Sequence, residues 1–258
     1  MSYVTLIPLR ARSVIRDLFG LRLKAHSLFV EQVRDKRGLE IGGPSGTFFD
    51  SGLVPLYKYV KSLDNCVFSS STLWEGTRDD RGPFVFDDRK PAGCNYVLDA
   101  TSLDGIASDA YDFVLSAHSL EHVANPVKAL REWMRVVKSG GVLVLILPNY
   151  RKTFDHRRNP TPVGHMLEDF ERGTTEDDTT HIEEVLALHD FSRDPMGGDY
   201  AEFRQRVLNN SQHRYMHQHV FDKNNSRELL EAVGMKVLCV ELAAPWHIVF
   251  LAHMPSRS

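Results

Sequence analysis

The chain has 258 residues, of which 42% are hydrophobic and 25% are charged, and its formal net charge at pH 7 is −3. This length and composition can bury one sizeable core, so we expect one domain with an elaboration, and the negative net charge gives no reason to expect a nucleic acid as partner. The 3 cysteines are too few for a disulfide framework or a Cys-rich zinc site. No stretch reaches the length of a membrane-spanning helix and no secretory leader is recognised, so we expect a cytoplasmic protein that binds small molecules and no membrane.

The N-terminal stretch, residues 3 to 36, carries apolar positions at helical spacing among many Arg and Lys residues. This spacing predicts one or two amphipathic helices that cover an edge of the fold. A membrane-surface role is less expected, because the apolar runs are short and acids are interspersed.

A short apolar run, Leu39-Glu-Ile41, leads into the Gly-rich turn Gly42-Gly-Pro-Ser-Gly46. This pattern is typical of a first parallel strand followed by a nucleotide-binding loop, since glycine lets the backbone approach a ligand closely. No Gly-Lys-Ser/Thr follows, so a P-loop is not indicated. The spacing also differs from the G-x-G-x-x-G pattern of dinucleotide-binding folds.

Glu40 lies two residues before the first glycine, and this arrangement resembles the first motif of the class I S-adenosylmethionine (SAM)-dependent methyltransferases, acid-x-Gly-x-Gly-x-Gly. The resemblance extends from about Arg37 to Pro148 and implies that SAM binds at this loop. Pro44 departs from the motif, because it stands where the middle glycine usually is. It stiffens the loop and removes one backbone donor.

The second strand is predicted over Leu56 to Leu63, and the resemblance implies that Asp64 at its end binds the ribose hydroxyls. Residues 66 to 93 are polar and rich in Gly and Pro, which indicates a loop or a broken helix. A third strand, Asn95 to Asp99, places Asp99 and Ala100 where methyltransferases bind the adenine. For either aspartate, a role in forming the following turn is the alternative.

The fourth strand is predicted over Tyr111 to Ser116. Pro126 is well placed to begin a helix, which should end at Ser139-Gly-Gly141. The continuous apolar run from Val142 to Leu147 is typical of a strand that is buried on both faces of a parallel sheet. Leu120-Glu-His followed by a proline-capped helix resembles the small-molecule, type 11-like branch of the superfamily.

The end of the sequence is predicted to form a helix capped at Asn225-Ser226 and two strands over Met235 to Ala243 and His247 to His253. The resemblance then implies an α/β fold with a Rossmann-like, seven-stranded methyltransferase sheet in the order 3-2-1-4-5-7-6. The expected divisions are an N-terminal helical cover (1–36), a SAM-binding core (37–149), a substrate lid inserted after the fifth strand (150–225), and a C-terminal helix and strands that complete the sheet (226–258).

The insertion holds seven of the 12 histidines and many acids, which is more polar than a packing helix requires. Because it follows the fifth strand, it should emerge at the carboxyl edge of the sheet, where the cofactor binds in this fold. We therefore expect its histidines to converge on the transferred methyl group. In an extended segment His217 and His219 would share one face, together with a lid carboxylate such as Glu183.

SAM carries its own driving force, so the protein mainly aligns a nucleophile and excludes water. A hydroxyl acceptor also needs a base, and a histidine that takes the proton contributes roughly 10²–10⁴-fold. The many histidines thus favour O-methylation of a small polar acceptor. Sugars or glycans, polyketide-type natural products and quinone-like phenols all stay open, and the polar lid favours a sugar.

Three alternatives to O-methylation with a histidine base remain. His118-x-x-Glu121-His122 resembles the Glu-x-x-Glu-His metal motif of a few quinone-pathway O-methyltransferases, so a divalent metal could activate the acceptor. The chain could also be a catalytically degenerate, regulatory SAM-fold protein or a nicotinamide oxidoreductase, and SAM binding separates these from the enzyme. The expected site residues are His118, His122, His217 and His219 for catalysis; Glu40, Gly42, Gly43, Gly46, Asp64, Asp99, Ala100 and Ser116 for the cofactor; and His118, Glu121 and His122 for a metal.

Overall fold

The structure, a computed structural model, describes residues 23–69, 71–72, 76–77, 82–194, 196, 198–243 and 245–256. In the N-terminal stretch it contains α2 (His26–Val33), which buries Phe29, Val30 and Val33. The rest of the predicted N-terminal cover lies outside the described residues. Within the described ranges, every helix is too short or too polar to cross a membrane.

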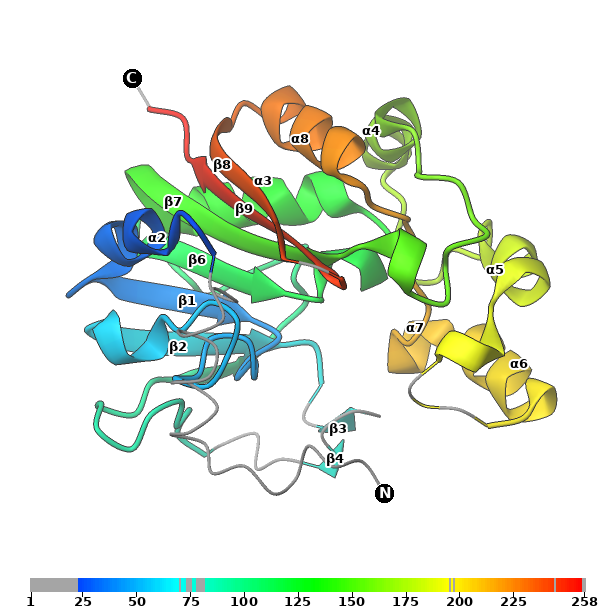
Figure 1. Ribbon diagram of the computed structural model, residues 1–258, viewed down its shortest axis with the longest axis horizontal. Helices are drawn as coiled ribbons and strands as arrows, with labels where there is room; N and C mark the ends of the chain where they lie inside the picture. The colour runs from blue at the N-terminus through cyan, green and yellow to red at the C-terminus, as the bar shows by residue number, and fades with distance from the viewer. Residues whose placement is uncertain are drawn as a thin grey trace.

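A seven-stranded sheet in the order β5-β2-β1-β6-β7-β9-β8 forms the centre of the fold (Figure 1). Counted along the chain this order is 3-2-1-4-5-7-6, which confirms the prediction. The first five strands are parallel, and β9 is antiparallel to both of its neighbours. The strands are β1 (Arg37–Ile41), β2 (Ser62–Val67), β5 (Asn95–Val97), β6 (Tyr111–Ala117), β7 (Val137–Pro148), β8 (Lys236–Ala243) and β9 (His247–His253), with a separate pair β3 (Ser71–Thr72) and β4 (Gly76–Thr77).

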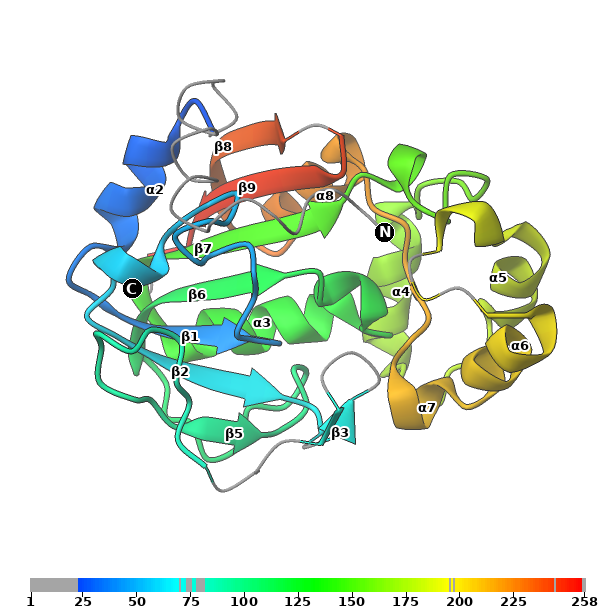
Figure 2. The same ribbon diagram turned by 60° about the horizontal axis from the view of Figure 1, so that its bottom comes forward.

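Helices cover both faces of this sheet (Figures 1 and 2). One face packs against α3 (Pro126–Val136), α4 (Val163–Arg172) and α8 (Lys223–Ala232), and the other against α2 and the 3₁₀ helix η2 (Tyr57–Tyr59). Successive side chains of a strand point to opposite faces, so in β7 Leu145 joins the first core and Val144 and Ile146 join the second. The apolar run noticed in the sequence is therefore buried on both faces, as predicted.

The predicted second strand was wrong by several residues. Leu56 and Tyr57 donate their backbone N–H groups to the Phe48 carbonyl, at 3.1 and 3.2 Å, and this folds the segment over the Gly-rich loop as η2. The strand follows it and continues to Val67. Asp64 thus lies in the middle of β2 and not at its end.

Three other boundaries also differ from the prediction. The predicted third strand ends at Val97 and not at Asp99. The helix after the fourth strand ends at Val136, and Gly140 and Gly141 lie inside β7, because Val137 is already extended and the β6 to β7 register shifts there. The last helix, α8, begins earlier than predicted, since the Asp222 carboxylate accepts the N–H groups of the first turn in a capping box.

The insertion after β7 divides into two parts. Its first helix, α4, belongs to the core, because Val163 and Met166 pack into the same cluster as α3 and α8. The remainder extends beyond the carboxyl edge of the sheet (Figure 1) and has a small apolar cluster that includes Phe203 and Tyr215. We call its three described helices, α5 (Ile182–Leu188), α6 (Tyr200–Leu208) and α7 (Asn210–His213), the lid helices. The 3₁₀ turn η4 (Tyr150–Lys152) lies between β7 and α4, and η5 (Phe191–Arg193) lies between α5 and α6.

Candidate active site

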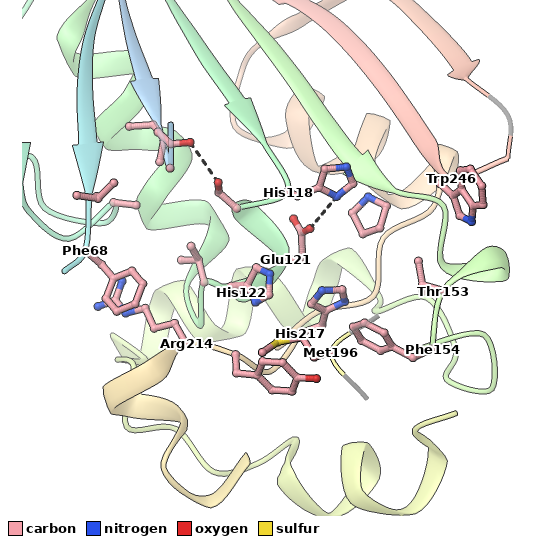
Figure 3. A pocket seen from close by; sticks show the side chains of 18 of the residues that line it. Phe68, His118, Glu121, His122, Thr153, Phe154, Met196, Arg214, His217 and Trp246 are labelled. Carbon is pink, nitrogen blue, oxygen red and sulfur yellow. Dashed lines mark hydrogen bonds and ion pairs between the residues drawn. The ribbon is translucent and has the colours of Figure 1, made fainter. Parts of the chain in front are cut away.

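A cavity of about 680 Å³ lies between the carboxyl ends of the parallel strands and the chain around the lid helices (Figure 3). This volume falls within the range of about 300–1,000 Å³ that is usual for small-molecule sites. The strand ends contribute Ile41, Gly42, Val67, Phe68, Leu98, Ala100, His118, Ser119, Glu121, His122 and Pro148, and the opposite wall contributes Thr153, Phe154, Asp194, Met196, Arg214, Tyr215, His217 and Trp246.

The Gly-rich loop is held from below by buried polar side chains. The carboxylate of Glu40 accepts hydrogen bonds from the Ser45 backbone N–H at 3.0 Å and from the Tyr57 hydroxyl at 2.7 Å. The Asn65 amide accepts from the Gly43 N–H at 2.9 Å and donates to the Gly43 carbonyl at 3.1 Å. Glu40 is fully buried and absent from the cavity wall, so its role is to shape the loop.

The three predicted glycines are not equivalent. Gly42 lines the cavity with φ +79°, and a Cβ there would lie 2.4 Å from the Ser119 hydroxyl oxygen. A Cβ on Gly43 would lie 2.3 Å from the Glu40 carboxyl carbon, whereas one on Gly46 would meet no atom within 4 Å. The Ser119 side chain and the positive φ thus require glycine at position 42, and its bare backbone faces the cavity, which fits a cofactor such as SAM.

Asp64 does not reach the cavity, and this contradicts its predicted role at the ribose. Its carboxylate is buried and accepts hydrogen bonds from Arg37 at 2.7 Å, the Tyr111 hydroxyl at 2.8 Å and the Cys94 N–H at 2.8 Å. The reason is the later end of β2, which brings Phe68 to the position expected for the acid.

After β5 and in β6, two more of the residues predicted to bind the cofactor, Asp99 and Ser116, have other partners or positions than expected. Ala100 lines the cavity, but the Asp99 carboxylate accepts from the Thr101 N–H at 2.7 Å and pairs with Arg214, whose guanidinium lies 4.8 Å from the Phe68 ring centroid. Burial raises the pKa of Asp99, but these donors outweigh it and hold the pKa below its ordinary value. Ser116 is fully buried in β6 and does not line the cavity; Ser119 does.

The loop after β6 brings two of the predicted catalytic residues, His118 and His122, to the cavity, and the segment after α7 brings a third, His217 (Figure 3). Glu121, His122 and His217 offer ligand atoms that lie within 4.8 Å of one another. His118 Nδ1 lies 3.4 Å from a Glu121 oxygen, and its Nε2 lies 2.8 Å from His247 Nδ1. His118, His122 and His217 therefore line one cavity, as expected, but the group with ligand atoms close enough to share one ion is Glu121, His122 and His217 rather than the predicted His118, Glu121 and His122.

His217 is oriented by a buried carboxylate. Its Nδ1 lies 2.5 Å from Asp155 Oδ2, and the other oxygen, Oδ1, accepts from Arg158 at 3.1 Å. An ionised carboxylate only accepts, so Nδ1 carries the proton and Nε2 is the nitrogen left for the cavity. Burial lowers the pKa of His217, but Asp155 outweighs burial and raises it above the ordinary value. The pKa of His122, by contrast, is lowered to about 4 by burial and the neighbouring His217, so its ring is neutral at pH 7.

His219 does not share this site, and the predicted common face of His217 and His219 was wrong. The backbone N–H groups of Gln218 and His219 both donate to the Glu121 carbonyl, at 2.8 and 3.3 Å, so the segment is not an extended strand with alternating side chains. His219 instead lies 3.1 Å from the Ala124 carbonyl oxygen. The predicted lid carboxylate Glu183 is exposed to solvent.

Several site residues were missed from the sequence. Phe68 could have been found, because Cys66-Val-Phe68 continues the apolar run that ends the strand. The other missed residues are Ser119, Asp155, Arg214 and Trp246, and for the pairing of Asp155 with His217 the sequence offers no local signal, since the two are 62 positions apart.

Known proteins resemble this chain in sequence over one segment and in fold over most of its length. Residues 86–145 match the family described as "Methyltransferase domain". No curated protein matches the sequence. A SAM-dependent methyltransferase from Methanosarcina mazei aligns with a TM-score of 0.52 and 18% identity over 89% of this chain and 98% of that chain. One from Mesorhizobium loti aligns with a TM-score of 0.50 and 12% identity over 89% and 95%.

At these identities the structural alignments establish the fold alone. The matched domain spans β5, β6, α3 and most of β7, and the glycine loop after β1 completes the expected cofactor side of the sheet. Residues 86–145 thus resemble a methyltransferase domain, and the order of the strands is that of the fold of SAM-dependent methyltransferases.

Proposed function

We propose that the enzyme transfers the methyl group of SAM to a hydroxyl oxygen of a small polar acceptor, with His217 as the general base. The observation that carries this proposal is the buried Asp155 and His217 pair at the cavity wall. Asp155 holds the Nδ1 proton, so Nε2 is free to receive the proton of an acceptor hydroxyl. Asp155 also raises the pKa of His217 above its ordinary value, which makes the neutral imidazole a stronger base.

The cofactor is assigned to the strand ends. SAM, when bound, supplies a methyl group that is activated by its positively charged sulfur. Gly42 leaves the backbone accessible, Phe68 and Leu98 offer apolar surface for a base, and Ala100 lines the wall between them. We therefore place the adenosine end near Phe68 and the methyl end near the loop after β6.

The residues around His217 support proton transfer. As the acceptor oxygen becomes the nucleophile, its proton passes to Nε2 of His217. The imidazolium so formed lies between two buried carboxylates, Asp155 and Glu121, whose negative charges favour it. Phe154, Tyr215 and Trp246 surround the opposite wall, and their apolar surfaces reduce the access of water.

The acceptor should carry a ring and several polar groups. Phe154, Tyr215 and Trp246 provide flat faces, while Lys152 and Arg193 bring positive charge to the same cavity. This combination supports a sugar, and an acceptor with an anionic substituent, such as a nucleotide sugar, would use the cations as well. Phenols and polyketide-type products would use the aromatic wall only.

A metal-assisted version is the second candidate, because Glu121, His122 and His217 already lie close enough to hold one ion. Two imidazoles and one carboxylate suit Zn, Fe or Mn better than Mg. The sequence suggested His118, Glu121 and His122 for this role; the geometry favours replacing His118 by His217. Such an ion would lower the pKa of the acceptor hydroxyl.

The test combines a cofactor-binding measurement with a screen of nucleotide sugars, in which release of S-adenosylhomocysteine reports turnover. The variant His217→Ala should lower kcat by roughly 10²-fold or more and leave the Kd for SAM nearly unchanged. The lid variant His213→Ala is the control, because His213 does not line the cavity. Equal rates for His217→Ala and the control would refute the general base, and a protein that does not bind SAM would refute the whole assignment.

A further inference from the structure

A second group of histidines lies outside the cavity. His165 is on α4, His181 immediately precedes α5, and His219 follows the lid helices; their ligand nitrogens lie within 4.8 Å of one another. Asp169, one turn after His165 on α4, reaches the same group. None of these four side chains lines the cavity, and the proposed methyl transfer does not use them.

The distances within this group match a compact coordination site. The Nε2 atoms of His165 and His181 are 3.1 Å apart, and Asp169 Oδ2 lies 3.4 Å from His165 Nε2 and 3.7 Å from His219 Nε2. In a tetrahedral zinc site with bonds of about 2.0–2.1 Å, neighbouring ligand atoms are roughly 3.3–3.4 Å apart. The four side chains thus need only small shifts to surround one ion.

Asp169 and His219 are buried and incompletely paired, whereas the side chains of His165 and His181 are 32% and 14% exposed. The Asp169 carboxylate is 8% exposed; its Oδ1 accepts from the Thr174 hydroxyl at 3.2 Å, while Oδ2 has no hydrogen-bond donor. The His219 side chain is 1% exposed; its Nδ1 has no hydrogen-bond partner, and its Nε2 lies 3.1 Å from the Ala124 carbonyl oxygen, a contact that an ion bound at Nε2 would replace. Burial raises the pKa of Asp169 and lowers the pKa of His219 to about 3. A buried carboxylate oxygen is costly unless a partner satisfies it, and a cation bound at Asp169 Oδ2 would do so.

We propose that His165, Asp169, His181 and His219 bind one Zn²⁺ ion at a site separate from the methyl-transfer cavity. Three imidazoles and one carboxylate are a donor set that zinc prefers. One neighbouring group already orients a ligand, as metal sites require: the Thr174 hydroxyl donates to Asp169 Oδ1.

The ion would connect parts of the chain that are far apart in sequence. Two ligands come from α4, which packs on the core helices, one from the start of the lid helices, and one from the segment after them. Because His219 is two positions from His217, the same ion would fix the segment that carries the proposed base. Its role is therefore structural, holding the lid in register with the sheet.

The test measures zinc directly. Protein purified without chelator should contain about one zinc per chain by elemental analysis, and Zn²⁺ titrated into metal-free protein should raise Tm. His181→Ala and the isosteric Asp169→Asn should each weaken zinc binding by more than about 100-fold, since even groups that only orient ligands contribute about 10- to 100-fold. His156→Ala, which changes a lid histidine outside the group, should retain the ion.

Two results would overturn the proposal. One is metal-free protein whose Tm and heat of titration do not respond to Zn²⁺ in excess. The other is zinc that is retained in folded Asp169→Asn but lost in His122→Ala, which would place the ion at the cavity cluster of Glu121, His122 and His217 instead. Circular dichroism of each variant shows that it is folded, and neither outcome depends on whether the methyl acceptor has been found.

Discussion

The sheet core and the lid helices are stabilised by different forces. The core has two large apolar clusters, one on each face of the sheet, and its strands carry few charges. The apolar cluster at the lid has five buried members among the described residues, and charged groups are paired in the interior around it, among them Asp155 with Arg158 and Asp194 with His189. Apolar burial makes a rigid platform for the cofactor, whereas paired charges place titratable groups at the cavity. The first region is therefore expected to control stability and the second catalysis.

We expect the largest effect from replacing one buried phenylalanine in the core and one in the lid by alanine. Phe250 in β9 and Phe203 in α6 are equally buried, at 0% and 1% exposure. Phe250→Ala should lower the free energy of unfolding of the whole chain by about 3–5 kcal/mol. Phe203→Ala should open only the lid, because its cluster is small and separate, and should abolish turnover with the core intact.

Denaturant unfolding and hydrogen exchange measure this difference. Exchange that rises in the lid helices alone for Phe203→Ala, and everywhere for Phe250→Ala, is the expected result. Equal losses of global stability in the two variants would mean that the lid and the core unfold as one unit, and the comparison would then fail.

The next effect concerns Asp64, which the sequence suggested as a ligand of the ribose and which the structure shows hydrogen-bonded inside the protein. Asp64→Ala removes the acceptor for Arg37, Cys94 N–H and the Tyr111 hydroxyl, and should destabilise the protein by about 1–3 kcal/mol. The Kd for SAM, measured by calorimetry on the folded variant, should stay unchanged. A tenfold weaker Kd would restore the ribose assignment that the sequence suggested.

A smaller effect is expected within the Gly-rich loop. Gly42→Val should weaken SAM binding by about tenfold or more, because its Cβ would fall 2.4 Å from the Ser119 hydroxyl and the residue has φ +79°. Gly46→Val is the matched control, since its Cβ meets no atom within 4 Å. Calorimetric titration with SAM measures the Kd of both variants. A similar loss of affinity in Gly42→Val and Gly46→Val would show that the whole loop, and not Gly42 alone, contacts the cofactor.

The smallest expected effect is a dependence of the stability of the lid on pH. Burial raises the pKa of Asp155, but His217 and Arg158 outweigh it and lower the pKa from 3.8 to about 2. A carboxyl whose folded-state pKa is lowered stabilises the fold above its ordinary pKa, and this contribution disappears as the pH falls from 3.8 toward 2. The partner His217 has a raised pKa, so its contribution is complete below pH 6.5 and is lost as the pH rises through the folded value.

Pepsin, which is active in acid, can detect this effect. We expect the first cleavages to fall in the lid helices as the pH is lowered from 4 to about 2, while the sheet core stays resistant. In Asp155→Asn the lid should already be sensitive at pH 4. First cleavages in the core strands would contradict the prediction.

The fold was largely predictable, because the sequence patterns that indicate it are short apolar runs and glycine-rich turns. The apolar run of β7 and the glycine loop after β1 identified a parallel sheet and its cofactor edge, and the strand order followed from the family resemblance. The main error, the register of β2, arose where an aromatic segment, Leu56 to Tyr59, packs as a 3₁₀ turn that alternation does not distinguish from a strand. That error displaced Asp64 from the middle of the strand to its end.

The sequence by itself determined the class of fold, the glycine loop at which the cofactor is expected, and the presence of a histidine-rich insertion near that loop. These features depend on hydrophobic periodicity and on glycine, whose effects act over a few residues. Only the tertiary structure decided which histidines meet: His217 turns to Asp155 and the cavity, and His219 turns to α4 and the proposed zinc site. Such pairings join residues far apart in the chain, and they are set by how the lid packs on the sheet, which no local pattern encodes.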